Sequence, residues 1–192
     1  RTDKAKRVAV LEHLPRVGKK ILATGNGRCN LGNLNATNHP YTNANFTAKI
    51  MSQYSAQSLI EFFESIGLYV RSDSEGRLYP HSNTAAAVLD ALRFECENLG
   101  VELICDCKVT SIKKEKNFII NGEYLAQKVI IACGGKSAPS QGSDGSGYPL
   151  LKGLGHRITP LAPSLVQLIT DTAKTKALKG VRAAASLTLS SG

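Results

Sequence analysis

Apolar residues follow two spacings along the chain, and each spacing predicts a different element. Two short continuous apolar runs, Val8–Leu11 and Val129–Ala132, are typical of buried strands in a parallel sheet. Longer segments with apolar residues every three or four positions predict amphipathic helices, and a glycine follows each as a C-terminal stop. These helices are expected over about Thr47–Ile66, Thr84–Leu99 and Tyr148–Leu154.

The extended segments between these elements predict antiparallel structure. Asn121-Gly122 separates two short apolar runs and is a strong signal for a β-hairpin turn. Asp73–Gly76 separates another pair in the same way. The strands predicted in these two regions are Tyr69–Ser72, Arg77–Tyr79, Val109–Ile112, Phe118–Ile120 and Tyr124–Leu125, and Val101–Cys107 is predicted as one more strand.

Long polar stretches are predicted as loops. Pro15–Asn45 is rich in glycine and asparagine, and a loop of that length is usually functional or disordered. Lys136–Gly147 is rich in glycine and serine, and alternation over Ala185–Leu189 predicts a strand. Helices, parallel-type strands and an inserted antiparallel meander together predict an α/β fold.

Composition and charge narrow the class of protein. The 192 residues are 42% apolar, and no apolar run approaches the ~18 residues that span a bilayer. A formal net charge of +9 is compatible with nucleic-acid or membrane contact. However, aromatic residues do not alternate with the basic clusters Arg1–Arg7 and Lys113–Lys116, so we assign this charge to solvated surface. We expect a cytoplasmic protein with neither a nucleic-acid nor a membrane partner.

The five cysteines are irregularly spaced and predict free thiols rather than a disulfide framework. No Cys-x-x-Cys pair occurs and the four histidines are scattered, so we expect no metal site. Cys29 follows Arg28, and a neighbouring cation favours the thiolate that nucleophilic or redox chemistry needs. The alternative, which we favour, is a small buried residue that packs beside a ligand.

Glu12 directly follows the first apolar run. In a dinucleotide-binding unit, an acid at the end of the second strand accepts hydrogen bonds from a ribose of the adenosine half. Many strands end in glutamate, so a solvated strand terminus is the alternative. The glycine fingerprint that stands ~20 residues before such an acid is not in the sequence. We therefore expect the chain to be part of a longer protein.

Two glycine-containing segments would let the backbone approach a ligand closely. Thr24-Gly-Asn-Gly-Arg-Cys-Asn30 combines glycines with hydrogen-bond donors for anionic or carbonyl oxygens. Ile130–Gly135 is an apolar run that ends in a glycine pair. The alternative for the first segment is a glycine-rich surface turn, and for the second a tight turn from strand to loop.

Together, and in this order, the segments resemble one bacterial family, the BaiN-like NAD(P)/FAD-dependent oxidoreductases. The similarity is carried by Val10–Glu12, Gly18–Asn30, Gly76–Pro80, Ala132–Ser137 and the glycine-rich segment 142–156. The resemblance implies an incomplete, three-layer FAD-binding domain of the two-dinucleotide-fold type over 1–162. The start of an inserted β-rich domain would follow over 163–192.

The resemblance also implies the residues that contact FAD. Glu12 would hold the adenosine ribose, and Val109 would present backbone groups to the adenine. The other implied contacts are Lys19, Lys20, Thr24, Gly25, Asn26, Gly27, Arg28, Cys29, Asn30, Ala132, Gly134 and Gly135. Cys133 departs from the family, which usually has threonine there.

The implied function is hydride or electron transfer, by a flavin-dependent oxidoreductase, on a small organic substrate. Catalytic residues remain unassigned, and nothing in the sequence independently indicates an NAD(P) site. The chain by itself is expected to be inactive. The alternative function is a non-catalytic scaffold domain that does not bind FAD by itself.

Overall fold

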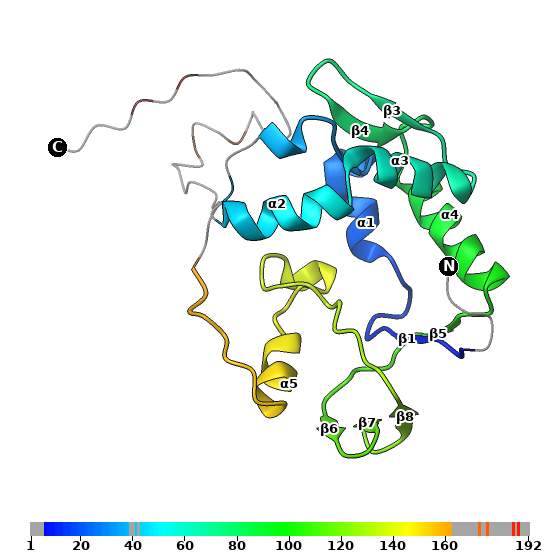
Figure 1. Ribbon diagram of the computed structural model, residues 1–192, viewed down its shortest axis with the longest axis vertical. Helices are drawn as coiled ribbons and strands as arrows, with labels where there is room; N and C mark the ends of the chain where they lie inside the picture. The colour runs from blue at the N-terminus through cyan, green and yellow to red at the C-terminus, as the bar shows by residue number, and fades with distance from the viewer. Residues whose placement is uncertain are drawn as a thin grey trace. The chain divides into compact units, whose positions relative to one another are not determined.

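The computed structural model describes residues 6–38, 41, 43–162, 173, 176, 186 and 188 (Figure 1). The chain divides into two units, Arg1–Ile158 and Thr159–Gly192. Every element named below lies in the first unit. The second domain over 163–192 and the strand over Ala185–Leu189 fall almost entirely outside the described residues and stay predictions.

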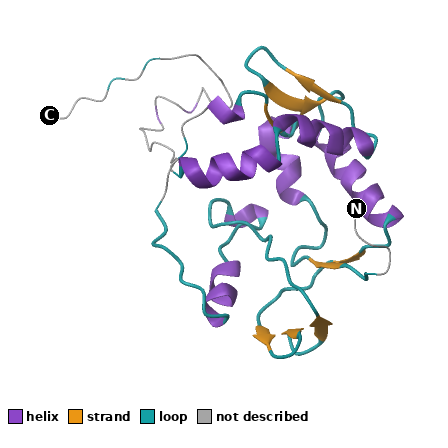
Figure 2. Ribbon diagram, in the orientation of Figure 1, coloured by secondary structure: helices purple, strands orange, loops and turns teal. Residues whose placement is uncertain are grey.

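The first unit contains both helices and strands, and the last four strands described in it follow one another without a helix between them (Figure 2). The helices are α1 (Lys19–Ala23), α2 (Ala44–Gln53), α3 (Ala56–Ser65), α4 (Ala85–Asn98) and α5 (Gly147–Gly153), with 3₁₀ turns η1 (Thr24–Gly27), η2 (Ala36–Asn38) and η3 (Pro139–Gln141). The strands are β1 (Ala9–Leu11), β2 (Gly32–Asn33), β3 (Val70–Ser72), β4 (Arg77–Pro80), β5 (Glu102–Ile104), β6 (Ile112–Lys114), β7 (Phe118–Ile120) and β8 (Tyr124–Ala126). No helix among these is long and apolar enough to cross a membrane.

The strands form one parallel pair and two antiparallel sheets, which confirms the predicted α/β class. β1 and β5 pair in parallel, while the antiparallel sheets have the orders β2-β4-β3 and β6-β7-β8. Both predicted hairpins are present. Asn121 and Gly122 adopt the left-handed backbone that their turn requires, with φ of 53° and 74°.

The first strand of the parallel pair is more exposed to solvent than the sequence predicted. Val8 and Val10 are 39% and 40% exposed, although an apolar run in a parallel sheet is normally buried on both faces. Within the described chain, β1 has a partner on one edge only, which is β5. The expectation of a fully buried strand is therefore wrong for the chain as described.

The prediction of a strand over Val129–Ala132 is also wrong: this run is loop (Figure 2). An apolar run forms a strand only when a neighbour supplies partners for its N–H and C=O groups. No strand of the described chain pairs with it, and Ile130 is 90% exposed. Local composition indicated strand propensity, but pairing decides whether a strand forms.

The single helix predicted over Thr47–Ile66 is two helices, α2 and α3, separated at Tyr54 and Ser55. The Ser55 hydroxyl accepts a hydrogen bond from the Ser58 N–H at 3.1 Å and begins a new helix. Gly67, with φ of 84°, ends α3 as predicted. The helical spacing of the apolar residues is confirmed, but the sequence pattern did not predict that Ser55 begins a second helix.

The polar stretch Pro15–Asn45 is not a featureless loop, because it contains α1, η1, β2 and η2. Helix α1 packs on α4, and its Ile21 and Leu22 join the hydrophobic core. The buried residues at the centre of this core are Cys29, Phe63, Leu68, Ala85 and Val88. The core anchors the segment Thr24–Asn30 between α4 and the β3–β4 hairpin, whose Leu78 and Tyr79 are also buried.

Candidate functional site

Glu12 lies at the carboxyl end of β1, where the sequence placed it. Its Oε1 accepts a hydrogen bond from the Leu14 N–H at 2.9 Å and lies 3.3 Å from Nδ1 of His13. Oε2 has no hydrogen-bond partner within the described chain, and the side chain is 26% exposed. One carboxylate oxygen therefore holds the local turn, and the other is available to a ligand hydroxyl.

Val109 is brought to the same edge of the parallel pair. The Cys107 N–H donates to the Glu12 carbonyl at 2.9 Å, and the Asp106 N–H donates to the Leu14 carbonyl at 3.1 Å. The N–H and C=O of Val109, two residues further on, make no hydrogen bond among the described residues. Unpaired backbone groups of this kind can pair with the edge of a purine base.

The two glycines of Ile130–Gly135 lie in a tightly packed loop. A Cβ on Gly134 would come 3.0 Å from Ser143 Oγ, and a Cβ on Gly135 would come 3.2 Å from Tyr148 Oη. The Gly145 N–H donates to the Gly135 carbonyl at 3.0 Å. Gly134 also has a left-handed backbone, with φ of 75°, which favours glycine whether or not a ligand is present.

The same glycine-rich loop contacts the turn after Glu12. A Cβ on Gly142 would lie 3.4 Å from both His13 Cε1 and Leu14 Cδ1. Hydrogen bonds from Ser146 lower the pKa of Asp144, with a smaller contribution from the nearby His13. His13 therefore lies between the Glu12 carboxylate and Gly142 of the glycine-rich loop, a position that the sequence did not predict.

The segment Thr24–Asn30 has an unusual backbone. Gly25, Asn26, Gly27 and Cys29 all have positive φ, at 55°, 57°, 80° and 59°. For asparagine this is uncommon and for cysteine more so; such strain concentrates at functional sites. Cys29 is 7% exposed within the core, which favours the small buried residue over an accessible redox thiol.

The structure thus places the predicted cofactor contacts in two groups. The first group consists of Glu12 and Val109. The loop that contains Gly134 and Gly135 belongs to it as well, because Gly142 of this loop packs against the turn after Glu12. Thr24–Asn30 and helix α1, with exposed Lys19 and Lys20, form the second. Ala132 is exposed in the unpaired run. No hydrogen bond or ion pair within the described chain joins the two groups.

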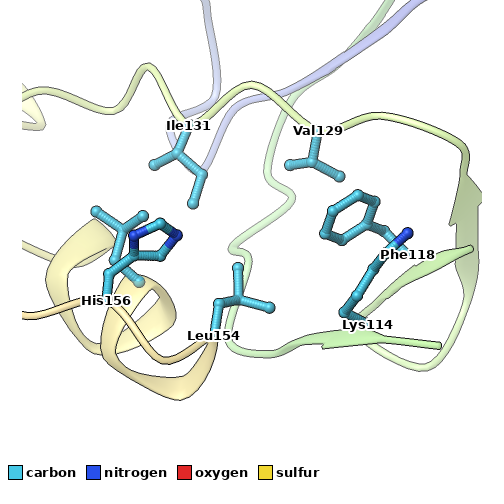
Figure 3. Close-up of a pocket in the computed structure, with 7 residues that line it drawn as sticks. Lys114, Phe118, Val129, Ile131, Leu154 and His156 are labelled. Atoms are coloured by element: carbon cyan, nitrogen blue, oxygen red, sulfur yellow. The ribbon is translucent and has the colours of Figure 1, made fainter.

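A cavity of about 420 Å³ lies away from both groups (Figure 3). Figure 3 shows Val129 and Ile131 of the unpaired run facing Phe118 of β7 and Leu154, which follows α5. The complete lining is Lys114, Phe118, Val129, Ile131, Leu151, Leu154 and His156. None of the predicted FAD contacts lines this cavity, and Val129 and Ile131 of the run without a strand partner form part of its apolar wall.

A parallel strand pair whose connection contains helices, with an acid at its carboxyl end, is typical of one class of domain, the Rossmann type. Comparison with known families gives the same class, because residues 1–186 match the HI0933-like protein Rossmann domain. The chain belongs to this HI0933-like family, and the resemblance inferred from the sequence is confirmed.

Three characterised relatives share this similarity. The chain is 41% identical over 174 residues to a 3-dehydro-bile acid delta(4,6)-reductase of Clostridium scindens. It is 26% and 28% identical, over 171 and 167 residues, to ribosomal RNA dihydrouridine synthases of Haemophilus influenzae and Escherichia coli. These alignments cover 88%, 84% and 84% of this chain, and 42% of each relative. The chain thus spans less than half the length of these relatives.

Proposed function

We propose that the chain supplies the adenosine-binding part of an FAD-dependent oxidoreductase. The observation that carries the proposal is that Glu12 and the unpaired backbone of Val109 both follow the parallel strands, whose ends are joined by the hydrogen bond from the Cys107 N–H to the Glu12 carbonyl. There Glu12 Oε2 is available to accept from the ribose hydroxyls, and the backbone of Val109 is available to the adenine edge. The residues present therefore fit the adenosine half of FAD.

Bound FAD would supply the hydride or electron chemistry, and the chain would bind and orient the cofactor. The loop that contains Gly134 and Gly135 packs beside the Glu12 turn and would cover this end of the nucleotide. Among the described residues we assign none to NAD(P). The small-molecule substrate and the cytoplasmic location remain predictions.

The names of the relatives favour one direction of the reaction. One names the reduction of a bile acid, and two name the formation of dihydrouridine. Each of these names denotes the addition of hydrogen to an unsaturated ring. We therefore propose that the protein reduces a carbon–carbon double bond of an organic substrate.

This activity is tested by anaerobic mixing of the flavin-reduced protein with an α,β-unsaturated ketone or with uridine. Return of the oxidised-flavin absorbance with one of them is the expected result. If neither compound reoxidises the flavin faster than buffer does, the proposed reduction is wrong.

An RNA substrate is the second candidate, because two relatives are named for ribosomal RNA and the net charge is +9. Neutralising phosphates releases counterions, so such binding must weaken steeply as salt rises. Titration with an RNA oligonucleotide at two salt concentrations tests it. Binding that is weak and independent of salt would exclude this candidate and favour a small molecule.

A further inference from the structure

Two arginine side chains converge on one buried tyrosine ring. Arg28 Cζ lies 4.5 Å from the ring centroid of Tyr79, and Arg71 Cζ lies 5.8 Å from it. The two guanidinium groups are therefore separated by no more than the sum of these distances. Arg71 faces Tyr79 across the β3–β4 ladder, whereas Arg28 comes from the segment Thr24–Asn30, more than forty residues away along the chain.

Neither arginine is neutralised by a carboxylate. Among the described residues, Arg28 and Arg71 take part in no ion pair. Arg77, on the neighbouring strand, shows the contrast, because it is paired with Asp73 at 2.8 Å and with Glu75 at 2.9 Å. Both side chains are half-buried, and the face of the Tyr79 ring favours the two cations without neutralising them, so their charge is available to an anion.

Both guanidinium groups are held in place by a single hydrogen bond each. Arg28 Nε donates to the Gly25 carbonyl at 3.3 Å, and Arg71 Nη2 donates to Asn83 Oδ1 at 2.7 Å. Asn83, like Asn26 and Cys29, has a left-handed backbone, with φ of 61°. Each guanidinium has five N–H donors, so most of them remain for a ligand.

We propose that Arg28 and Arg71 together bind an anionic oxygen group of the substrate, a carboxylate or a phosphate. Guanidinium groups form charge-assisted, frequently bidentate hydrogen bonds with both kinds of group. This assignment rests on the proposed oxidoreductase function. The family resemblance implies that Arg28 contacts FAD. We give the anion to the substrate instead, because dinucleotide phosphates bind at a glycine-rich helix N-terminus and the adenosine contacts Glu12 and Val109 lie in the other group of residues.

The test is calorimetric titration of the full chain with inorganic phosphate and with citrate. Arg28→Gln and Arg71→Gln are each expected to weaken binding of the better probe at least tenfold. Arg93→Gln is the matched control, because Arg93 is exposed and pairs with Asp90 at 3.7 Å, and it should bind as the wild type does. Equal binding by all four proteins would overturn the proposal.

A measurement on the unmodified chain covers the case in which a variant fails to fold. Phenylglyoxal modifies accessible arginines, and the bound probe should protect Arg28 and Arg71, located by peptide mass spectrometry, but not Arg93. Lack of protection would overturn the site.

FAD separates the two sources of the anion. If FAD displaces the probe and binds more weakly to both variants, the anion belongs to the cofactor and the substrate assignment is wrong. Probe binding that persists with FAD bound supports the substrate assignment. A chain that binds the probe but never binds FAD would instead contradict the proposed function and leave the anion site standing.

Discussion

At the scale of single residues, the site depends on how each polar atom is already used. Among the described residues, Glu12 uses one oxygen to bind the Leu14 N–H and has no partner for the other, and the N–H and C=O of Val109 are both unpaired. Arg77 is neutralised by two carboxylates, and Arg28 and Arg71 are not. These differences, rather than residue type, separate groups that stabilise the fold from groups that remain for a ligand.

Glu12→Gln should weaken FAD binding by about 1–3 kcal/mol, or roughly 5- to 150-fold. The amide oxygen keeps the hydrogen bond from the Leu14 N–H, but the amide nitrogen cannot accept from a ribose hydroxyl. Fluorescence titration with FAD measures the effect, and Glu102→Gln, at the exposed first residue of β5, is the matched control. An FAD affinity equal to that of the control would remove Glu12 from the cofactor site.

Gly25→Ala should lower the free energy of unfolding more than Gly27→Ala. Both glycines are left-handed, so both substitutions carry a backbone cost of about 1–2 kcal/mol. A Cβ at Gly25 would also lie 2.8 Å from the Asn30 backbone nitrogen, whereas a Cβ at Gly27 meets nothing within 4 Å. The clash adds about 1–3 kcal/mol. Equal midpoints in urea denaturation would contradict this account of the loop.

At the scale of elements, side-chain hydrogen bonds decide where helices and hairpins begin. Ser55 starts α3 in the middle of a periodic apolar pattern, and Asp73 closes the β3–β4 turn by accepting from the N–H groups of Glu75 and Arg77. The hairpin holds Tyr79 opposite Arg71. The Asp73 turn therefore fixes the position of Arg71 and Tyr79, the surface on which we place the anion.

Ser55→Ala should lower the free energy of unfolding by about 1 kcal/mol, because the Ser58 N–H loses its partner. Thr84→Ala is the matched control at the start of α4, since Thr84 makes no side-chain cap hydrogen bond there. Thermal unfolding compares the two variants. A loss for Thr84→Ala as large as that for Ser55→Ala would show that capping is not the cause.

Asp73→Asn should destabilise the protein at neutral pH by an amount that fades in acid. The hydrogen bond from Arg77 holds the pKa of Asp73 below the ordinary aspartate value of about 3.9. The ionised form is thus favoured by folding, and its contribution is present above that value and lost as the pH falls through the folded-state pKa. Unfolding midpoints measured from pH 7 downward should converge for the two proteins. A constant gap would contradict the role of the charge.

At the scale of the molecule, the sequence predicted turns and helix ends that depend on glycine, although it did not predict the break at the Ser55 N-cap. Gly67 and Gly122 marked their turns correctly, and the run before Glu12 became a strand that ends at the site. The run Val129–Ala132 was wrongly predicted as a strand, because strand formation depends on a partner strand that the sequence of the run does not specify. The contact between Arg28 and the Tyr79 ring likewise depends on the packing of distant segments, and no sequence motif predicted it.

The central claim is that this chain binds FAD through the adenosine half. The most direct measurement is the visible absorption spectrum of the purified chain after incubation with FAD and desalting, beside a sample incubated with FMN, which has no adenosine. We predict flavin bands that are retained with FAD and absent with FMN. A colourless protein in both samples, or equal retention of both flavins, would contradict the claim; the first result would favour a scaffold domain that does not bind FAD by itself.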